Sequence, residues 1–185
     1  KSVRLFVFDF GNADDGSSIG HEISTRMWPS LALALPVLLL GLFVNVSMAL
    51  LMAFFRATYL DFWGVVLCVV MLSISSLFYI IVGQYVLAYQ LGWFPVQGWG
   101  PDWWTNLFKF AALPIIVGVA VSLAPDVRLY RTFFLDEMQQ DYVRTARAKG
   151  MSEQRVMGAH VLRNAAIPLV THVLIQLPAL LAGAF

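Results

Sequence analysis

Long apolar stretches separated by short polar ones dominate the pattern along this chain. No charged residue occurs between Arg26 and Arg56, and none occurs between Asp61 and Asp102. Each gap exceeds the roughly 20 apolar residues that a helix needs to cross a hydrocarbon core about 30 Å thick. Apolar runs of this length indicate membrane spans rather than the core of a soluble protein. The pattern therefore predicts an all-α fold, a polytopic bundle of transmembrane helices.

Four apolar segments have the length and composition of spans. We predict the first at 29–55, the second at 62–91, the third at 110–124 and the fourth from 165 to 185. The third is short for a full crossing, so we expect its helix to continue beyond Pro125 and past the membrane surface.

The remaining segments divide the chain. Residues 1–29 are mixed and rich in turn-forming glycine and serine, which favours an extracytoplasmic connecting segment before a membrane domain at 30–185. Loop 92–109 carries several tryptophans, a residue that collects at the membrane–water interface, so we expect this loop at the outer surface. The chain begins at Lys1 and stops within an apolar run, so we expect it to be truncated at both ends.

A few polar residues interrupt the first two predicted spans. Small hydroxyl and amide side chains let helices approach closely and hydrogen-bond to one another in a bilayer. We therefore expect these residues to pack between helices, with a position lining a transport pathway as the alternative. They are Asn45, Ser47, Ser73, Ser75 and Ser76.

The distribution of charge predicts the orientation. The chain is 59% hydrophobic and 12% charged with a net charge of +1, which argues against the basic surface of a nucleic-acid-binding protein. Four alternating spans place eight of its twelve Lys and Arg residues on one side, at Arg56 and in loop 126–164. The positive-inside rule makes this side cytoplasmic.

Loop 126–164 has a regular pattern of its own. Residues 141–149 favour a helix with a small apolar face, and Gly150 supplies the left-handed conformation that commonly ends a helix. Ser152 is placed to cap a second helix at about 153–163, and Pro168 falls within the first turns of the next span. Such a helix–break–helix element would dock on a cytoplasmic partner or lie on anionic lipid.

Two runs in this loop carry a resemblance to a known family. They read D-Y-V-R-T-A-R-A-K-G-M-S-E-Q-R-V at 141–156 and H-V-L-R-N-A-A-I-P at 160–168. Together they resemble the EAA-type loop of binding-protein-dependent ABC importer permeases, most closely the dipeptide, oligopeptide and nickel branch. Residues 9–11, 23–35 and 91–98 resemble outer segments of the same family, so nearly the whole chain is covered.

The resemblance implies a type I importer, in which this chain is a permease subunit forming half of the translocation pathway. It implies as partners a second similar permease subunit, two ABC ATPase subunits or domains, an extracytoplasmic solute-binding protein and the lipid of a prokaryotic cell membrane. ATP and Mg²⁺ would act in the ATPases, and this chain would carry no catalytic residue, metal or cofactor. Peptide is the expected substrate, with nickel, glycosides and peptide antibiotics open.

The same resemblance makes the loop a coupling helix that sits in a cleft of the ATPase. Small residues at Ala146 and Gly150 suit a helix pressed into a cleft, while Arg144, Arg147 and Lys149 are placed to pair with acidic groups on its rim. The generic glutamate and first alanine of the motif are replaced here by Arg144 and Thr145. The coupling residues implied are Asp141, Tyr142, Arg144, Thr145, Ala146, Lys149, Gly150, Ser152 and Pro168.

Two other classes of membrane protein are alternatives to an importer. A membrane-embedded enzyme needs paired ionisable or metal-binding groups within its spans, and the first two predicted spans have none. His21, His160 and His172 have no ligand spacing, and we interpret His172 as a satisfied helix residue. An ion-coupled secondary transporter or channel remains the alternative, although we find no acidic relay within the spans.

Overall fold

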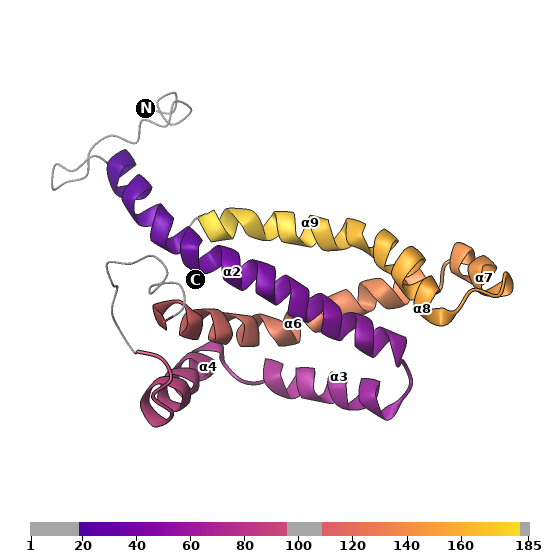
Figure 1. The fold of residues 1–185 in the computed structure, drawn as a ribbon, viewed down its shortest axis with the longest axis horizontal. Helices are drawn as coiled ribbons and strands as arrows, with labels where there is room; N and C mark the ends of the chain where they lie inside the picture. The colour runs from indigo at the N-terminus through magenta and orange to yellow at the C-terminus, as the bar shows by residue number, and fades with distance from the viewer. Residues whose placement is uncertain (1–18, 96–108, 182–185) are drawn as a thin grey trace.

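The computed structural model describes the backbone of residues 19–95 and 109–181, and the side chains of residues 30–95 and 109–178. Every regular element in these ranges is helical (Figure 1), as predicted. The elements are α2 (Ile19–Phe54), α3 (Tyr59–Leu72), α4 (Ser76–Gly83), the π-helical η1 (Gln84–Gln90), α6 (Ala112–Met138), α7 (Asp141–Ala148), α8 (Glu153–Val156), the π-helical η3 (Met157–Val161) and α9 (Leu162–Leu181).

Three helical segments are long and apolar enough to cross a membrane: Ser30–Phe54, Ala112–Met138 and Glu153–Pro178. A bent pair, Tyr59–Leu72 with Ser76–Gln90, makes a fourth if it is counted as one span. Helix α2 packs along α6, and both also contact α9 and α3 (Figure 1). The fold class and the number of spans agree with the sequence prediction.

The first helix starts earlier than predicted. Helix α2 begins at Ile19, inside the segment that we expected to be a connection. Residues 21–28 contain neither glycine nor proline, so a helix can propagate through them at little cost. The predictions for residues 1–18 and for most of the tryptophan-rich loop fall outside the described ranges.

The second predicted span is broken rather than continuous. Its two halves meet at an angle of 92° around Ser73 and Ser75. The Ser73 hydroxyl donates to the carbonyl of Val69 at 3.0 Å, and the extended backbone of Ser75 starts the next helix. The Tyr79 hydroxyl donates to the carbonyl of Met71 at 2.8 Å, which links the second half of the bent pair back to the end of α3. Hydropathy alone misses such a break because both halves are equally apolar.

The last two long helices are continuous where the sequence suggested interruptions. Helix α6 runs through Pro125 to Met138, which confirms the expected extension. The second helix of the loop does not end before the fourth span, because Glu153 to Pro178 forms one uninterrupted helical run. Pro168 lies within α9, since a transmembrane helix tolerates the single backbone hydrogen bond that a proline removes.

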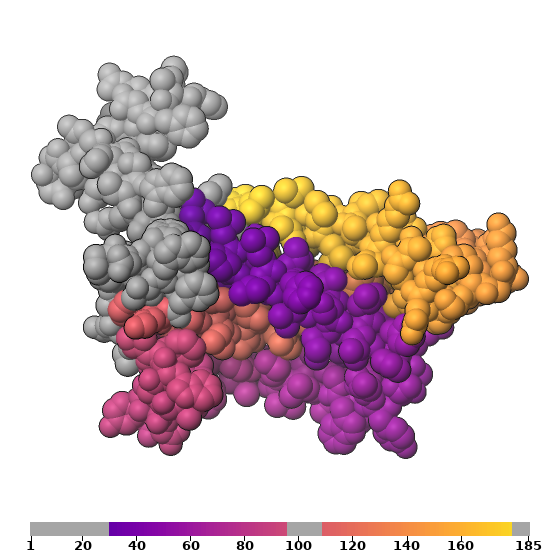
Figure 2. All heavy atoms as spheres, viewed as in Figure 1, coloured from indigo at the N-terminus to yellow at the C-terminus, as the bar shows by residue number. Residues whose placement is uncertain are grey.

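Close packing of the bundle is concentrated at the end where α7 and α8 lie. Figure 2 shows these helices as a knob projecting beyond the longer helices. Elsewhere large apolar side chains are exposed, among them Phe43, Trp63 and Ile167, as expected of surfaces that meet lipid or another subunit. The buried cluster beneath the knob consists of Ala49, Met52, Ala53, Cys68, Ala124, Val127, Tyr130, Phe134, Met138, Val143, Ala146, Val156, Met157, Val161, Ala165 and Leu169.

The close approach of α2 to α6 depends on small residues. A Cβ atom at Gly118 of α6 would lie 2.9 Å and 3.2 Å from the two γ-carbons of Val37 in α2. A Cβ atom at Gly41 of α2 would lie 3.3 Å from the Ser122 hydroxyl. Small residues at such contacts let transmembrane helices pack backbone to backbone.

Gly118→Ala is expected to lower the melting temperature of the purified subunit relative to Gly158→Ala. Both substitutions raise helix propensity, but only the first creates a clash, since nothing lies within 4 Å of a Cβ at Gly158. Overpacking of this kind costs about 1–3 kcal/mol. Thermal unfolding in detergent measures the difference, and equal melting temperatures would contradict the close α2–α6 contact.

Candidate functional site

Helix α7 ends in a defined glycine motif. The N–H of Met151 donates to the carbonyl of Ala146 at 3.3 Å, and the N–H of Gly150 donates to that of Arg147 at 2.9 Å. This is the Schellman pattern, in which the glycine adopts a left-handed conformation. Gly150 has a φ of +79°, so the predicted role of this residue as a helix terminator is confirmed.

The inner face of α7 packs on the chain itself. Val143 is fully buried and Ala146 is 5% exposed, and both belong to the buried cluster with Phe134 and Met138 of α6 and Val156 of α8. We expected Ala146 to press into a cleft of the partner ATPase. That role stays a prediction, and in this chain the side chain of Ala146 belongs to the buried core. The three- and four-residue spacing of apolar positions marked a buried face without indicating what buries it.

The outer face of α7 is polar and exposed. Asp141, Arg144, Thr145 and Lys149 all lie on it. Arg144 and Asp141 approach to 3.6 Å, but their side chains are 73% and 97% exposed, so this pair adds little stability. Four of the predicted coupling residues are therefore presented together on a surface that is free for a partner.

An ion pair bridges the turn that follows α7. The Nε and Nη2 atoms of Arg147 donate to the two carboxylate oxygens of Glu153 at 3.1 Å and 2.5 Å. Arg147 precedes Gly150 in sequence and Glu153 follows it, so the pair holds α7 against α8 across the glycine turn. Bidentate pairing of this kind restricts the relative orientation of two elements.

Tyr142 lies at the edge of the same element. Its hydroxyl donates to the carboxylate of Glu137 at the end of α6, and its ring centroid is 6.4 Å from that of His160. Burial raises the pKa of Tyr142, and the neighbouring Glu137 carboxylate raises it further. The phenol therefore stays protonated and remains a hydrogen-bond donor.

Ser152 and Pro168, the last two predicted coupling residues, lie outside α7. Ser152 is the residue before α8 and has the extended backbone of an N-cap, but its side chain makes no capping hydrogen bond. Pro168 lies inside α9 and is half-buried, away from the exposed face of α7. The structure therefore brings together the residues from Asp141 to Ser152 and leaves Pro168 outside the knob.

The polar residues of the first two spans differ in whether they hydrogen-bond to another helix or to their own. The Asn45 amide nitrogen of α2 donates at 3.1 Å both to the Ser122 hydroxyl and to the Asp126 carboxylate of α6. Ser47 instead donates to the carbonyl of Phe43 in its own helix. A pathway role for these residues, and for the three serines at the break of the second span, remains a prediction.

Asp126 is a charged residue within the candidate membrane span Ala112–Met138. The charged stretch starts at this residue, and Asp126 lies in the part of α6 that extends beyond Pro125. Among the side chains that the structure describes, no group of three His, Cys, Asp or Glu residues is placed to hold a metal ion. One carboxylate hydrogen-bonded to Asn45 is a helix-to-helix contact rather than a chain of proton carriers.

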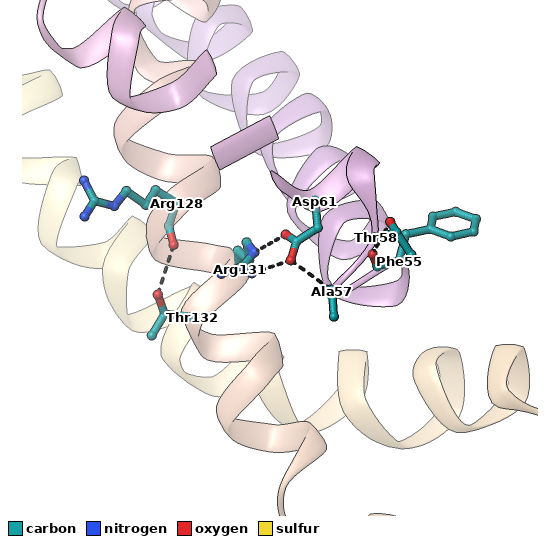
Figure 3. A network of polar contacts seen from close by, with 7 residues as sticks. All are labelled: Phe55, Ala57, Thr58, Asp61, Arg128, Arg131 and Thr132. Atoms are coloured by element: carbon teal, nitrogen blue, oxygen red, sulfur yellow. Dashed lines mark hydrogen bonds and ion pairs between the residues drawn. The ribbon is translucent and has the colours of Figure 1, made fainter. Parts of the chain in front are cut away.

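An ion pair between α3 and α6 was missed by the sequence analysis. The Nε and Nη2 atoms of Arg131 donate to the two oxygens of Asp61 at 2.7 Å each (Figure 3). Asp61 is 6% exposed and also accepts a 3.2 Å hydrogen bond from the N–H of Ala57. Both residues border apolar runs, but 70 positions separate them, and only the folded chain pairs them.

Replacing Val143 by alanine is expected to destabilise the subunit, whereas Thr145→Ala is expected to leave its stability nearly unchanged. Both residues lie on α7, but Val143 is fully buried and Thr145 is exposed. Loss of buried methyl groups leaves a cavity that costs about 1–3 kcal/mol. Thermal unfolding of the two purified variants tests this, and equal stability would show that α7 does not pack on the core as described.

Comparisons with known proteins agree with these observations. A family model described as "binding-protein-dependent transport system inner membrane component" matches residues 45–185. A putative peptide transport system permease protein of Brucella suis is 30% identical over 171 residues, covering 91% of this chain and 54% of that protein. An oligopeptide transport system permease protein of Bacillus subtilis is 31% identical, covering 95% and 57%.

A glutathione transport system permease protein of Salmonella typhimurium is 32% identical over 165 residues, covering 89% of this chain and 52% of that protein. The chain thus spans about half the length of the curated relatives it matches. The family model alone covers more than two thirds of the chain, and three described helical segments are long and apolar enough to cross a membrane. The chain belongs to the family of binding-protein-dependent transport system inner membrane components.

Proposed function

We propose that this chain is part of the permease subunit of an ATP-driven peptide importer, and that it couples to its ATPase through α7. The observation that carries the proposal is the division of α7 into two faces. Its inner face is buried against α6 and α8, while its outer face presents Asp141, Arg144, Thr145 and Lys149 at one end of the bundle. A partner protein that binds the outer face of α7 and moves would also move the helices that pack on its inner face.

In this proposal, movement of the ATPase subunits drives the transport cycle. ATP binding brings the paired ATPase subunits together, and α7 follows the cleft in which it sits. Because Val143 and Ala146 share a buried cluster with residues of α6 and α8, and Arg147 is paired with Glu153, displacement of α7 would be passed to α6 and α9 rather than absorbed by a loose loop. With a second permease subunit, the spans would alternate between outward-open and inward-open arrangements.

The chemistry of ATP belongs to the partners in this proposal. ATP and Mg²⁺ would be bound by the ATPases, and the chain would serve transport without a catalytic residue of its own. A solute-binding protein would deliver the substrate at the opposite membrane surface. Family membership supports this assembly, since the name of the family refers to binding-protein-dependent transport.

Peptides are the substrate class that we propose. The relatives described above carry names that refer to peptide, oligopeptide and glutathione transport. These names share the peptide bond as a chemical feature, since glutathione is itself a small peptide. Binding of labelled peptides to the solute-binding protein encoded with this permease would test the substrate class, and exclusive binding of nickel or a glycoside would contradict it.

The energy source is tested with the full-length permease reconstituted with its partner subunits in lipid vesicles. Uptake of a labelled peptide is expected to require ATP and an active ATPase, and to continue when ionophores dissipate ion gradients. Uptake that needs an ion gradient but no ATPase would overturn the proposal in favour of a secondary transporter.

Charge reversal on the outer face of α7 is expected to weaken ATPase docking. Arg144→Glu should lower ATP-dependent peptide uptake by about tenfold or more, because a like-charge contact at an interface costs several kcal/mol. Arg163→Glu is the matched control, since Arg163 is exposed on α9 rather than on α7. Co-purification of the ATPase and uptake by vesicles measure the effect, and equal behaviour of the two variants would exclude Arg144 from the docking surface.

A further inference from the structure

Three polar side chains within six residues of α6 attach it to three other helices. Asp126 accepts a hydrogen bond from Asn45 of α2, and the Tyr130 hydroxyl lies 3.2 Å from Nδ1 of His172 in α9. Arg131 forms its ion pair with Asp61 of α3. We call this ring of contacts the polar collar, and its six members are Asn45, Asp61, Asp126, Tyr130, Arg131 and His172.

The polar collar lies next to the base of the docking knob. Phe134 and Met138 follow Tyr130 on α6 at four-residue intervals, and both are buried in the cluster that holds α7. From Arg131 to Met138 the helix rises by about 10 Å. One stretch of α6 thus contacts the docking element at one end and three membrane helices at the other.

The ion pair is the most constrained contact of the collar. Asp61 accepts two hydrogen bonds from Arg131 and a third from the backbone of Ala57, which has a φ of +62°. A non-glycine residue in this left-handed conformation costs about 1 kcal/mol, so the surrounding contacts must hold it. Asp61 therefore fixes the turn that joins α2 to α3 and connects this turn to α6.

We infer that Asp61 and Arg131 are positioning residues for energy coupling: their ion pair transmits the movement of α7, through α6, to the turn between α2 and α3. The inference rests on the proposed function, in which α7 docks on the ATPase. Apolar contacts between helices are not directional, and a bidentate guanidinium–carboxylate pair adds a defined geometry to them. Separating the pair would also leave a buried charge without its partner, which is strongly unfavourable.

A purely stabilising ion pair would give different results from a transmitting one. Removing one partner of a buried pair is destabilising in either case, because it leaves the other charge uncompensated. Removing both charges together relieves that penalty. A variant neutral at both positions therefore separates stability from transmission.

The experiment uses the complete transporter in lipid vesicles and measures peptide uptake per ATP hydrolysed, together with the amount of assembled permease. Asp61→Asn and Arg131→Gln are expected to lower both quantities. The double variant should regain a normal amount of permease while its uptake per ATP stays at least about fivefold below wild type, the lower end of typical coupling effects. Arg131→Lys keeps the charge but loses the two-pronged geometry, and should likewise lower uptake per ATP.

Arg128→Gln is the matched control. It removes the same charge from the same helix three residues away, and the Arg128 guanidinium points away from Asp61 in Figure 3. We expect this variant to keep normal uptake per ATP. A normal ratio in the double variant or in Arg131→Lys would overturn the inference, as would an equal loss in Arg128→Gln. ATP-independent uptake by the wild type would instead overturn the proposed function itself.

Discussion

Burial of the inner face of α7, in one cluster with residues of α6 and α8, is the constraint that holds this loop to the membrane helices. Val143 and Ala146 lie in one cluster with Phe134 and Met138, and this cluster continues through α8 into α9. Without it, α7 would be a short helix of eight residues, a length that is not stable alone in water. Tertiary packing therefore converts a polar loop into a rigid extension of two membrane helices.

Hydrogen bonds and an ion pair also join the membrane helices, and these contacts have defined geometry. Lipid offers no hydrogen-bonding partners, so polar groups within a helical bundle find them on neighbouring helices. Asn45, Tyr130 and Arg131 each reach a partner on another helix, and all three contacts meet on one short stretch of α6. Helix α6 thus shares a buried cluster with α7 and is also the helix at which these polar contacts meet.

Residues on the two faces of α7 differ in how much they contribute to the stability of the chain. Residues of the inner face contribute to stability, because replacing them leaves a cavity or a buried charge in the core of the chain. Residues of the outer face make only exposed local contacts: Arg144 pairs with Asp141 at 3.6 Å, and the Thr145 hydroxyl donates to the Asp141 carbonyl at 2.9 Å. A substitution at Ala146 is therefore expected to affect folding, whereas the outer positions are those at which the proposed docking is tested.

Sequence alone determined the fold class, the approximate number of spans, the extension of α6 and the glycine end of α7, because each depends on local hydropathy or on the backbone preference of single residues. Tertiary structure decided which face of α7 is buried, where the second span breaks and which charges pair. Asp61 and Arg131 lie 70 residues apart, and Tyr79 reaches back across the break to Met71. Such contacts depend on how helices pack, and periodicity along one helix contains no information about the neighbour that covers it.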